Sequence, residues 1–196
     1  MSKIILATTS LYRKEVFSYI GIPFRTEGSN VDESQVKESD PKKLVKILSQ
    51  LKAEAVFKNN KDAVVIGMDS VGCFKGQIFG KPKSKKEAFQ RLQLLSSENH
   101  QFYTGIYVVD GILGKRISRV VKTEIFMRKL SDKEIERYLN EDPYFNTYAL
   151  GYDPLKHLSS TFVKRIEGSY NNFLRGIPLE KIAEILYELR AEEWDG

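Results

Sequence analysis

The sequence predicts an α/β protein in which helices flank a mixed, twisted central sheet and two lobes enclose a cleft. Three observations support this prediction. Strand-like and helix-like segments alternate through the first half of the chain, as they do in α/β folds. The second half alternates apolar and polar residues over 100–110 and 116–129, which predicts a long hairpin. The apolar run at 63–68 is typical of a buried central strand.

The remaining elements follow from short apolar runs and from capping residues. Ser10, Asp40, Ser84 and Ser131 are suited to cap helices, and proline directly follows Asp40. Residues 142–159 are irregular and rich in aromatic side chains. We therefore expect helices at 10–20, 41–58, 84–95, 131–141 and from 178, and further strands at 3–8, 23–26, 73–79 and 161–166.

Length and composition indicate one ordinary globular domain over residues 1–196. The hydrophobic fraction is 41%, yet no apolar run approaches the roughly 20 residues of a membrane span. The first strand is too short for a signal-peptide core. Cys73 is the only cysteine, which excludes an intrachain disulfide. We expect its small side chain to be buried in the core. We expect a cytoplasmic protein with no membrane partner.

The net charge of +5, from 31 basic and 26 acidic side chains, suits a polyanionic ligand. A nucleic acid is the alternative to a nucleotide. The lysines are scattered along the chain and form no continuous basic stripe. We therefore expect no stable nucleic-acid partner.

The most informative residue is Asp69, which directly follows the predicted strand at 63–68. A carboxylate at the end of a central strand is costly to bury and lies where α/β proteins bind ligands. Asp32 and Glu33 follow the second predicted strand. Carboxylates from separate strand ends suit Mg²⁺ or Mn²⁺, although a polar loop and a capping carboxylate explain the same residues.

Several isolated cations could accompany these acids. Arg13 and Lys14 lie one turn into the helix capped by Ser10, where amide hydrogens and the helix dipole favour an anion. Lys81 precedes a proline that stiffens the local backbone. A surface helix start with two solvated cations is the alternative for Arg13 and Lys14, and a simple strand-terminating turn is the alternative for Lys81.

Lys52 lies at the edge of the predicted apolar face of the helix over 41–58. Snorkelling to solvent and an inward position against a phosphate explain this placement equally well. The apolar face itself is expected to comprise Leu44, Leu48, Leu51 and Ala55.

His100 is interpreted as a structural histidine. Asp69 could also be the nucleophile of an aspartyl-phosphate phosphatase. Such enzymes generally carry a second aspartate two residues later, where this chain has Val71.

Taken together, these segments resemble the Maf family, septum-formation-inhibitor-like proteins that are nucleoside triphosphate pyrophosphatases with a fold like that of inosine triphosphate pyrophosphatase. Each segment alone is weak, but eight occur in order along nearly the whole chain. They are LATTSLYRK at 6–14, VDE at 31–33, LSQLKAEAV at 48–56, VVIGMDSV at 64–71, GKP at 80–82, HQFYTG at 100–105, LSDKEIERYL at 130–139 and VKRIEGSYNNFLRGIPL at 163–179.

The resemblance implies hydrolysis of a nucleoside triphosphate to the monophosphate and pyrophosphate, a house-cleaning activity that depends on Mg²⁺ or Mn²⁺. It implies metal binding by Glu33 and Asp69, with Asp69 as proton acceptor. It also suggests a homodimer. The phosphate contacts implied are those of Ser10, Arg13, Lys14, Lys52 and Lys81.

Departures from the family pattern fall at positions that tune base choice. The chain has Leu11 and Tyr12 where the usual opening has proline and arginine, and Ser70 where threonine is usual. Tyr12 with Asp153 looks more like the branch that hydrolyses 7-methyl-GTP, since a cationic ring stacks well on an aromatic face. Preference for dTTP and UTP is the alternative, and Tyr12 could instead be a packing residue.

Overall fold

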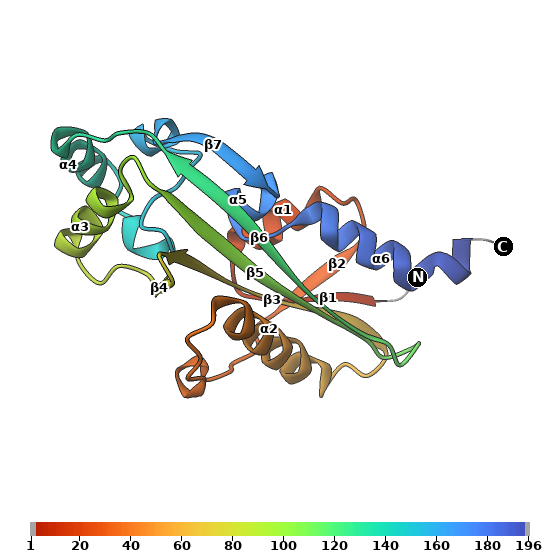
Figure 1. Cartoon of the computed structure of the whole chain (residues 1–196). Coiled ribbons are helices and arrows are strands. Elements are labelled where there is room, and N and C mark those ends of the chain that lie inside the picture. The colour runs from red at the N-terminus through yellow and green to blue at the C-terminus, as the bar shows by residue number, and fades with distance from the viewer. Residues whose placement is uncertain (1–2, 195–196) are drawn as a thin grey trace.

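The structure, a computed structural model, describes residues 3–194 and is built on one seven-stranded mixed sheet (Figure 1). The strand order is β2-β1-β3-β5-β6-β7, and β4 pairs with β3 outside this path. β1 pairs in parallel with β2 and β3, whereas all other pairs are antiparallel. The strands are β1 (Lys3–Ala7), β2 (Phe24–Glu27), β3 (Ala63–Phe74), β4 (Gln77–Phe79), β5 (Asn99–Asp110), β6 (Arg116–Met127) and β7 (Val163–Gly168).

The predicted capping residues begin the helices as expected. Ser10, Asp40, Ser84 and Ser131 each accept hydrogen bonds from backbone amides of the first helical turn. The helices are α1 (Leu11–Ser18), α2 (Pro41–Phe57), α3 (Lys85–Leu95), α4 (Asp132–Glu141), α5 (Tyr170–Arg175) and α6 (Leu179–Trp194), with short 3-10 turns η1 (Glu33–Gln35), η2 (Phe145–Thr147) and η3 (Leu158–Thr161).

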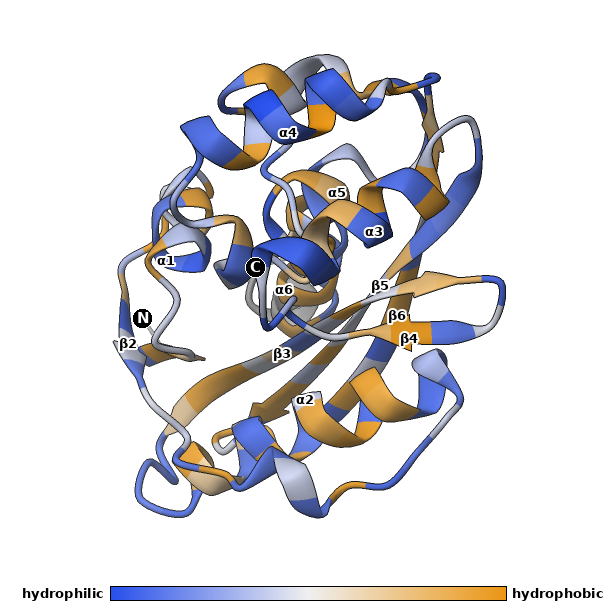
Figure 2. Cartoon of the chain, turned by 90° about the vertical axis from the view of Figure 1, so that its left-hand side faces the viewer, coloured by the Kyte–Doolittle hydropathy of each residue, from blue (hydrophilic) through white to orange (hydrophobic). Residues whose placement is uncertain are grey.

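Helices cover both faces of the sheet. Val64, Ile66 and Met68 of β3 belong to the apolar cluster that includes α1 and α6. Val65, between them, packs in a separate cluster with α2. This alternation follows from the two-residue period of a strand, and Figure 1 shows α2 on the side opposite α6. Figure 2 shows hydrophobic stretches along α2 and a hydrophilic turn after it.

A third apolar cluster forms the second lobe, where α3 and α4 pack beside the far ends of the long strands (Figure 1). It is rich in aromatic side chains, among them Tyr138, Tyr152, Phe162 and Phe173. β3, β5 and β6 run through both lobes and hold them on one sheet. The expected α/β architecture, with helices flanking a mixed sheet, is therefore confirmed.

The prediction that a strand ends at residue 68 is wrong. β3 continues from Ala63 to Phe74, so Asp69 lies within the strand and pairs with Gly105 of β5. The parallel neighbour β1 is shorter, and its last residue, Ala7, pairs with Gly67. Asp69 therefore lies just beyond the end of β1, where one edge of β3 is left uncovered.

The predicted apolar face of α2 is only partly correct. Leu48 is buried, but Leu51 is 39% exposed, and the buried face also includes Val45, Ala53 and Val56. The face is therefore rotated relative to the prediction. The long hairpin of β5 and β6 is confirmed, as is the burial of Cys73. The short helix α5 was not predicted.

Candidate active site

A cleft of about 880 Å³ lies beside the uncovered edge of β3. Its charged lining comes from α1, α2, β3 and the turn after β4, and includes Arg13, Lys52, Asp69 and Lys81. The rest of its lining is largely aromatic and aliphatic. This second part comprises Leu11, Tyr12, Leu48, Val71, Phe79, Phe102, Tyr148, Ala149, Leu150, Tyr152, Pro154, Phe173 and Leu174, joined by Arg175.

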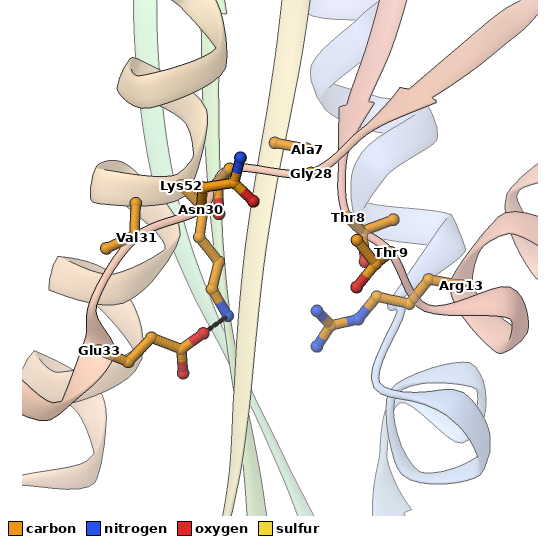
Figure 3. A pocket seen from close by; sticks show the side chains of 10 residues that line it. Ala7, Thr8, Thr9, Arg13, Gly28, Asn30, Val31, Glu33 and Lys52 are labelled. Carbon is orange, nitrogen blue, oxygen red and sulfur yellow. Dashed lines mark ion pairs between the residues drawn. The ribbon is translucent and has the colours of Figure 1, made fainter.

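Lys52 is held inward between two carboxylates. Its Nζ lies 2.6 Å from Asp69 Oδ1 and 2.8 Å from Glu33 Oε1, and its side chain is only 13% exposed. The sequence left snorkelling and an inward position equally open, and the structure selects the inward one. Figure 3 shows Glu33 and Lys52 on one side of the adjoining hollow, with Thr8, Thr9 and Arg13 on the other.

Two glycines bring α2 close enough for this contact. A Cβ added to Gly67 would lie 2.2 Å from the Ser49 carbonyl oxygen, and one added to Gly105 would lie 2.1 Å from that of Val45. Any side chain at either position would push the helix away from the sheet. The two glycines therefore allow α2 to lie close to the sheet, which brings Lys52 within reach of Asp69.

Burial raises the pKa of Asp69, while Lys52 and Arg13 act in the opposite direction. Asp69 is only 7% exposed, so its charged form is poorly solvated. Glu33 is on η1 and half exposed at its side chain. One buried and one accessible carboxylate thus meet at a single ammonium group.

Arg13 binds three acceptors, none of them a carboxylate. Its Nη1 donates to the Met68 carbonyl at 2.9 Å, its Nη2 to Ser70 Oγ at 2.7 Å and its Nε to the Gly176 carbonyl at 3.1 Å. Burial lowers the pKa of Arg13. The guanidinium joins α1 to β3 and to the segment after α5, and no direct ion pair with a described side chain of residues 3–189 neutralises its charge.

Ser70 and Lys81 occupy different parts of the cleft wall. Ser70 Oγ lies 2.7 Å from Thr104 Oγ1, so this hydroxyl is held by both Arg13 and a neighbouring strand. Lys81 is exposed in the turn after β4. Arg91 of α3 supports that turn, since its Nη1 donates to the carbonyls of Gly80 at 2.5 Å and Ala149 at 3.0 Å.

The structure places the other predicted site residues as follows. Ser10 and Tyr12 line the cleft, whereas Lys14 is exposed and does not. Asp153 is fully buried behind the wall, where its Oδ1 accepts from Arg175 Nη1 at 2.9 Å. His100 is buried in the core beside Tyr152, in agreement with the structural interpretation.

Sequence reasoning missed Arg175 and Tyr148 as cleft residues. The six residues of α5 are too few to show helical periodicity. Tyr148 lies in the irregular segment, for which no orientation could be predicted. Arg175 lies within the segment 163–179 that carries the family resemblance, but a cation next to a glycine does not by itself indicate a cleft residue.

No group of three or more His, Cys, Asp or Glu side chains that could hold a metal ion occurs among the described side chains of residues 3–189. Glu33 and Asp69 do, however, both contact the Lys52 ammonium group, so their carboxylates lie close enough to share one cation. Mg²⁺ in enzyme sites is commonly held by one or two carboxylates, waters and substrate phosphates. This pair therefore fits such an ion.

No helix in the described part of the chain is long and apolar enough to cross a membrane. The fold is similar to that of a HAM1 protein from Coxiella burnetii, whose solved structure matches with a TM-score of 0.55. That match covers 96% of this chain and 100% of the other, at 15% identity. At this identity the match shows a shared fold and supports the architecture described above.

Residues 3–189 match the family described as Maf-like protein, so this chain belongs to the Maf family. It is 37% identical to a dTTP/UTP pyrophosphatase of Alkaliphilus metalliredigens (strain QYMF), over 96% of each chain. It is also 37% identical to a nucleoside triphosphate pyrophosphatase of a Synechococcus strain, over 95% of this chain and 93% of the relative. A dTTP/UTP pyrophosphatase of Bacillus anthracis is 33% identical over 98% of each chain.

These comparisons confirm the predicted family. They do not support the predicted 7-methyl-GTP branch, because the relatives named for a base preference are dTTP/UTP pyrophosphatases. The alternative base preference fits these relatives better.

Proposed function

We propose that this protein hydrolyses nucleoside triphosphates to the monophosphate and pyrophosphate, with dTTP and UTP as preferred substrates. The observation that carries the proposal is the meeting of Glu33, Lys52 and Asp69 at one end of a cleft of about 880 Å³. The aromatic remainder of that cleft is suited to a nucleoside. The names of the relatives support both the reaction and the pyrimidine preference.

In this proposal Glu33 and Asp69 hold Mg²⁺ or Mn²⁺. The ion, when bound, offsets the charge of the triphosphate and of the leaving pyrophosphate. The Lys52 ammonium already lies between both carboxylates, so it is placed to contact a phosphate bound next to them. Ser10, Arg13 and Lys81 supply further donors from the opposite wall and the rim.

Asp69 is proposed to accept the proton of the attacking water. Its raised pKa makes the carboxylate a stronger base than an exposed aspartate. The strand holds it rigidly against β5, so the direction of attack is set by the fold rather than by a loop. Water attack on one phosphorus then releases pyrophosphate from the nucleotide.

The test is a panel of nucleoside triphosphates with Mg²⁺ or Mn²⁺, scored by pyrophosphate release. We expect release to be fastest with dTTP and UTP, and Asp69→Asn to lower kcat at least about 100-fold, because it removes the proposed base. Asp62→Asn is the matched control. Asp62 also pairs with a lysine, Lys3, but both side chains are exposed outside the cleft.

Two outcomes would count against the proposal. Pyrophosphate release that is equal in the wild type and Asp69→Asn would remove the catalytic role of this carboxylate. Release of inorganic phosphate alone would indicate a different phosphoric anhydride reaction. Cytoplasmic location and a homodimer are parts of the same proposal, to be checked by fractionation and by mass in solution.

A further inference from the structure

Arg175 is an arginine in the apolar part of the cleft. It ends α5, lines the cleft and has a side chain that is only 11% exposed. Its guanidinium carbon lies 4.9 Å from the centre of the Tyr12 ring, and that ring lies 6.5 Å from the ring of Tyr148. A cation therefore lies among aromatic side chains, and it pairs with a different carboxylate from the two that Lys52 joins.

One side of this guanidinium is already in use. Nη1 donates to Asp153 Oδ1 at 2.9 Å and to the Leu174 carbonyl at 3.2 Å. Nε and Nη2 make no hydrogen bond within the described residues. These two nitrogens share one edge of the guanidinium plane, so they form a fork of parallel donors. That fork is free to bind a ligand.

Asp153 holds the arginine in this position. The carboxylate is fully buried, and its Oδ2 has no hydrogen-bond partner among the described side chains of residues 3–189 or the described backbone. A buried carboxylate needs a nearby cation, and Arg175 supplies it. The ion pair fixes the side chain against the wall, so its orientation does not depend on the ligand.

The stacking face of Tyr12 is consequently next to a positive charge. The guanidinium of Arg175 already covers one face of the Tyr12 ring, so a cationic base such as 7-methylguanine cannot stack on that face and would bring a second cation beside it. A neutral base that carries carbonyl oxygens would instead accept charge-assisted hydrogen bonds from the fork. The electrostatics of this wall thus oppose the base preference that Tyr12 suggests in the sequence.

We propose that Arg175 is a specificity-determining residue that donates to a carbonyl oxygen of the nucleobase and rejects positively charged bases, with Asp153 as its positioning residue. This inference rests on the proposed function and names the residue that selects the base.

Uracil and cytosine provide the sharpest comparison. Both have the same ring and the same O2 carbonyl, but uracil has a second carbonyl oxygen at C4 where cytosine has an amino group. An amino group facing the donors of Arg175 would leave both sides without an acceptor. We therefore expect UTP to be favoured over CTP by about 10- to 100-fold.

The experiment uses variants that separate the charge of Arg175 from its geometry. Arg175→Gln alone would leave the Asp153 carboxylate buried without its cation. It is therefore combined with Asp153→Asn, which removes the negative charge as well. Arg175→Lys keeps the charge but loses the fork. Arg165→Gln is the matched control, because Arg165 also stacks on a ring, that of Phe126, and pairs with a carboxylate, Glu167, outside the cleft.

Each variant is assayed as kcat/KM with UTP against CTP and with GTP against 7-methyl-GTP, and as binding of UMP and CMP by calorimetry. The double variant should lower the UTP-to-CTP ratio at least about tenfold and raise the 7-methyl-GTP-to-GTP ratio. Arg175→Lys should lower the first ratio and leave the second near the wild-type value. Arg165→Gln should change neither.

Equal losses for every nucleotide would assign Arg175 to phosphate binding and overturn the inference. Unchanged ratios in both Arg175 variants, with thermal unfolding showing that they are folded, would also overturn it. These failures differ from failure of the proposed function, which would appear as no pyrophosphate release by the wild type with any nucleotide. UMP and CMP binding reports on Arg175 in either case.

Discussion

At the scale of single residues, burial decides what each titratable group can do. Asp69 and His100 are both buried, but the carboxylate meets Lys52 while the imidazole meets only a tyrosine hydroxyl. His100 Nδ1 has no hydrogen-bond partner within residues 3–194. Asp69 can therefore exist charged within the cleft, whereas burial favours the neutral ring of His100.

His100 makes the stability of the protein depend on pH. Burial lowers its pKa to about 4, whereas an unfolded chain has a histidine pKa near about 6.5. Between these values the unfolded state binds more protons, so the free energy of unfolding falls as the pH falls from about 6.5 to about 4. The full contribution is roughly 3 kcal/mol.

Urea denaturation of the wild type and His100→Gln at pH 7 and pH 5 checks this prediction. The variant lacks the titrating group, so its disadvantage relative to the wild type should shrink at pH 5. Parallel losses of stability in the two proteins would show that His100 does not titrate in this way.

At the scale of elements, the site depends on how closely α2 lies against the sheet. Ser49 and Ala53 of the helix pack over Gly67, and Val45 packs over Gly105. Lys52 projects from the same helix to Asp69 on β3. The position of α2 and the contact between Lys52 and Asp69 therefore change together.

We expect Gly105→Ala to destabilise the protein by at least about 2 kcal/mol and to lower kcat, because a Cβ would lie 2.1 Å from the Val45 carbonyl oxygen. Gly80→Ala is the control for stability, since a Cβ there meets no atom within 4 Å. Thermal unfolding and pyrophosphate release measure the two effects. A Gly105→Ala variant as stable as Gly80→Ala would contradict the close packing of α2.

At the scale of the whole molecule, the cleft is closed by segments that are far apart in the chain. Arg91 of α3 donates to the carbonyls of Gly80 and Ala149, and its Nη2 donates to Glu87 at 2.8 Å. One side chain thus holds the turn that carries Lys81 and the wall that carries Tyr148. Neither segment belongs to a regular helix or strand at these points.

Arg91→Gln should therefore raise the KM for UTP more than it lowers kcat, because Lys81 and the aromatic wall lose their support while Asp69 and Lys52 do not. A rise of about tenfold corresponds to roughly 1.4 kcal/mol. Arg137→Gln is the control, since Arg137 makes an exposed pair within α4. An unchanged KM for UTP in Arg91→Gln would show that neither the turn with Lys81 nor the segment with Tyr148 depends on Arg91 for its position.

Local patterns in the chain were sufficient to predict most elements and several members of the site. Capping residues marked the starts of α1 to α4, because caps act within one helical turn. Asp69 was a candidate because a carboxylate next to a central apolar strand is costly to bury. Glu33 was a candidate because it follows a second strand, and Lys52 because it lies at the edge of the apolar face of a helix. The order of motifs along the chain indicated the family that residues 3–189 match.

Contacts between distant segments could not be obtained in this way. Whether Lys52 turned inward depended on Gly67 and Gly105, which act through a helix that is remote from both in sequence. The cation beside Tyr12 comes from residue 175 and is held by Asp153, so the sequence near Tyr12 carried no sign of it. The charged side chains can be identified from the sequence. The electrostatic field at a site, however, is the sum over all neighbouring charges, and only folding brings those groups together.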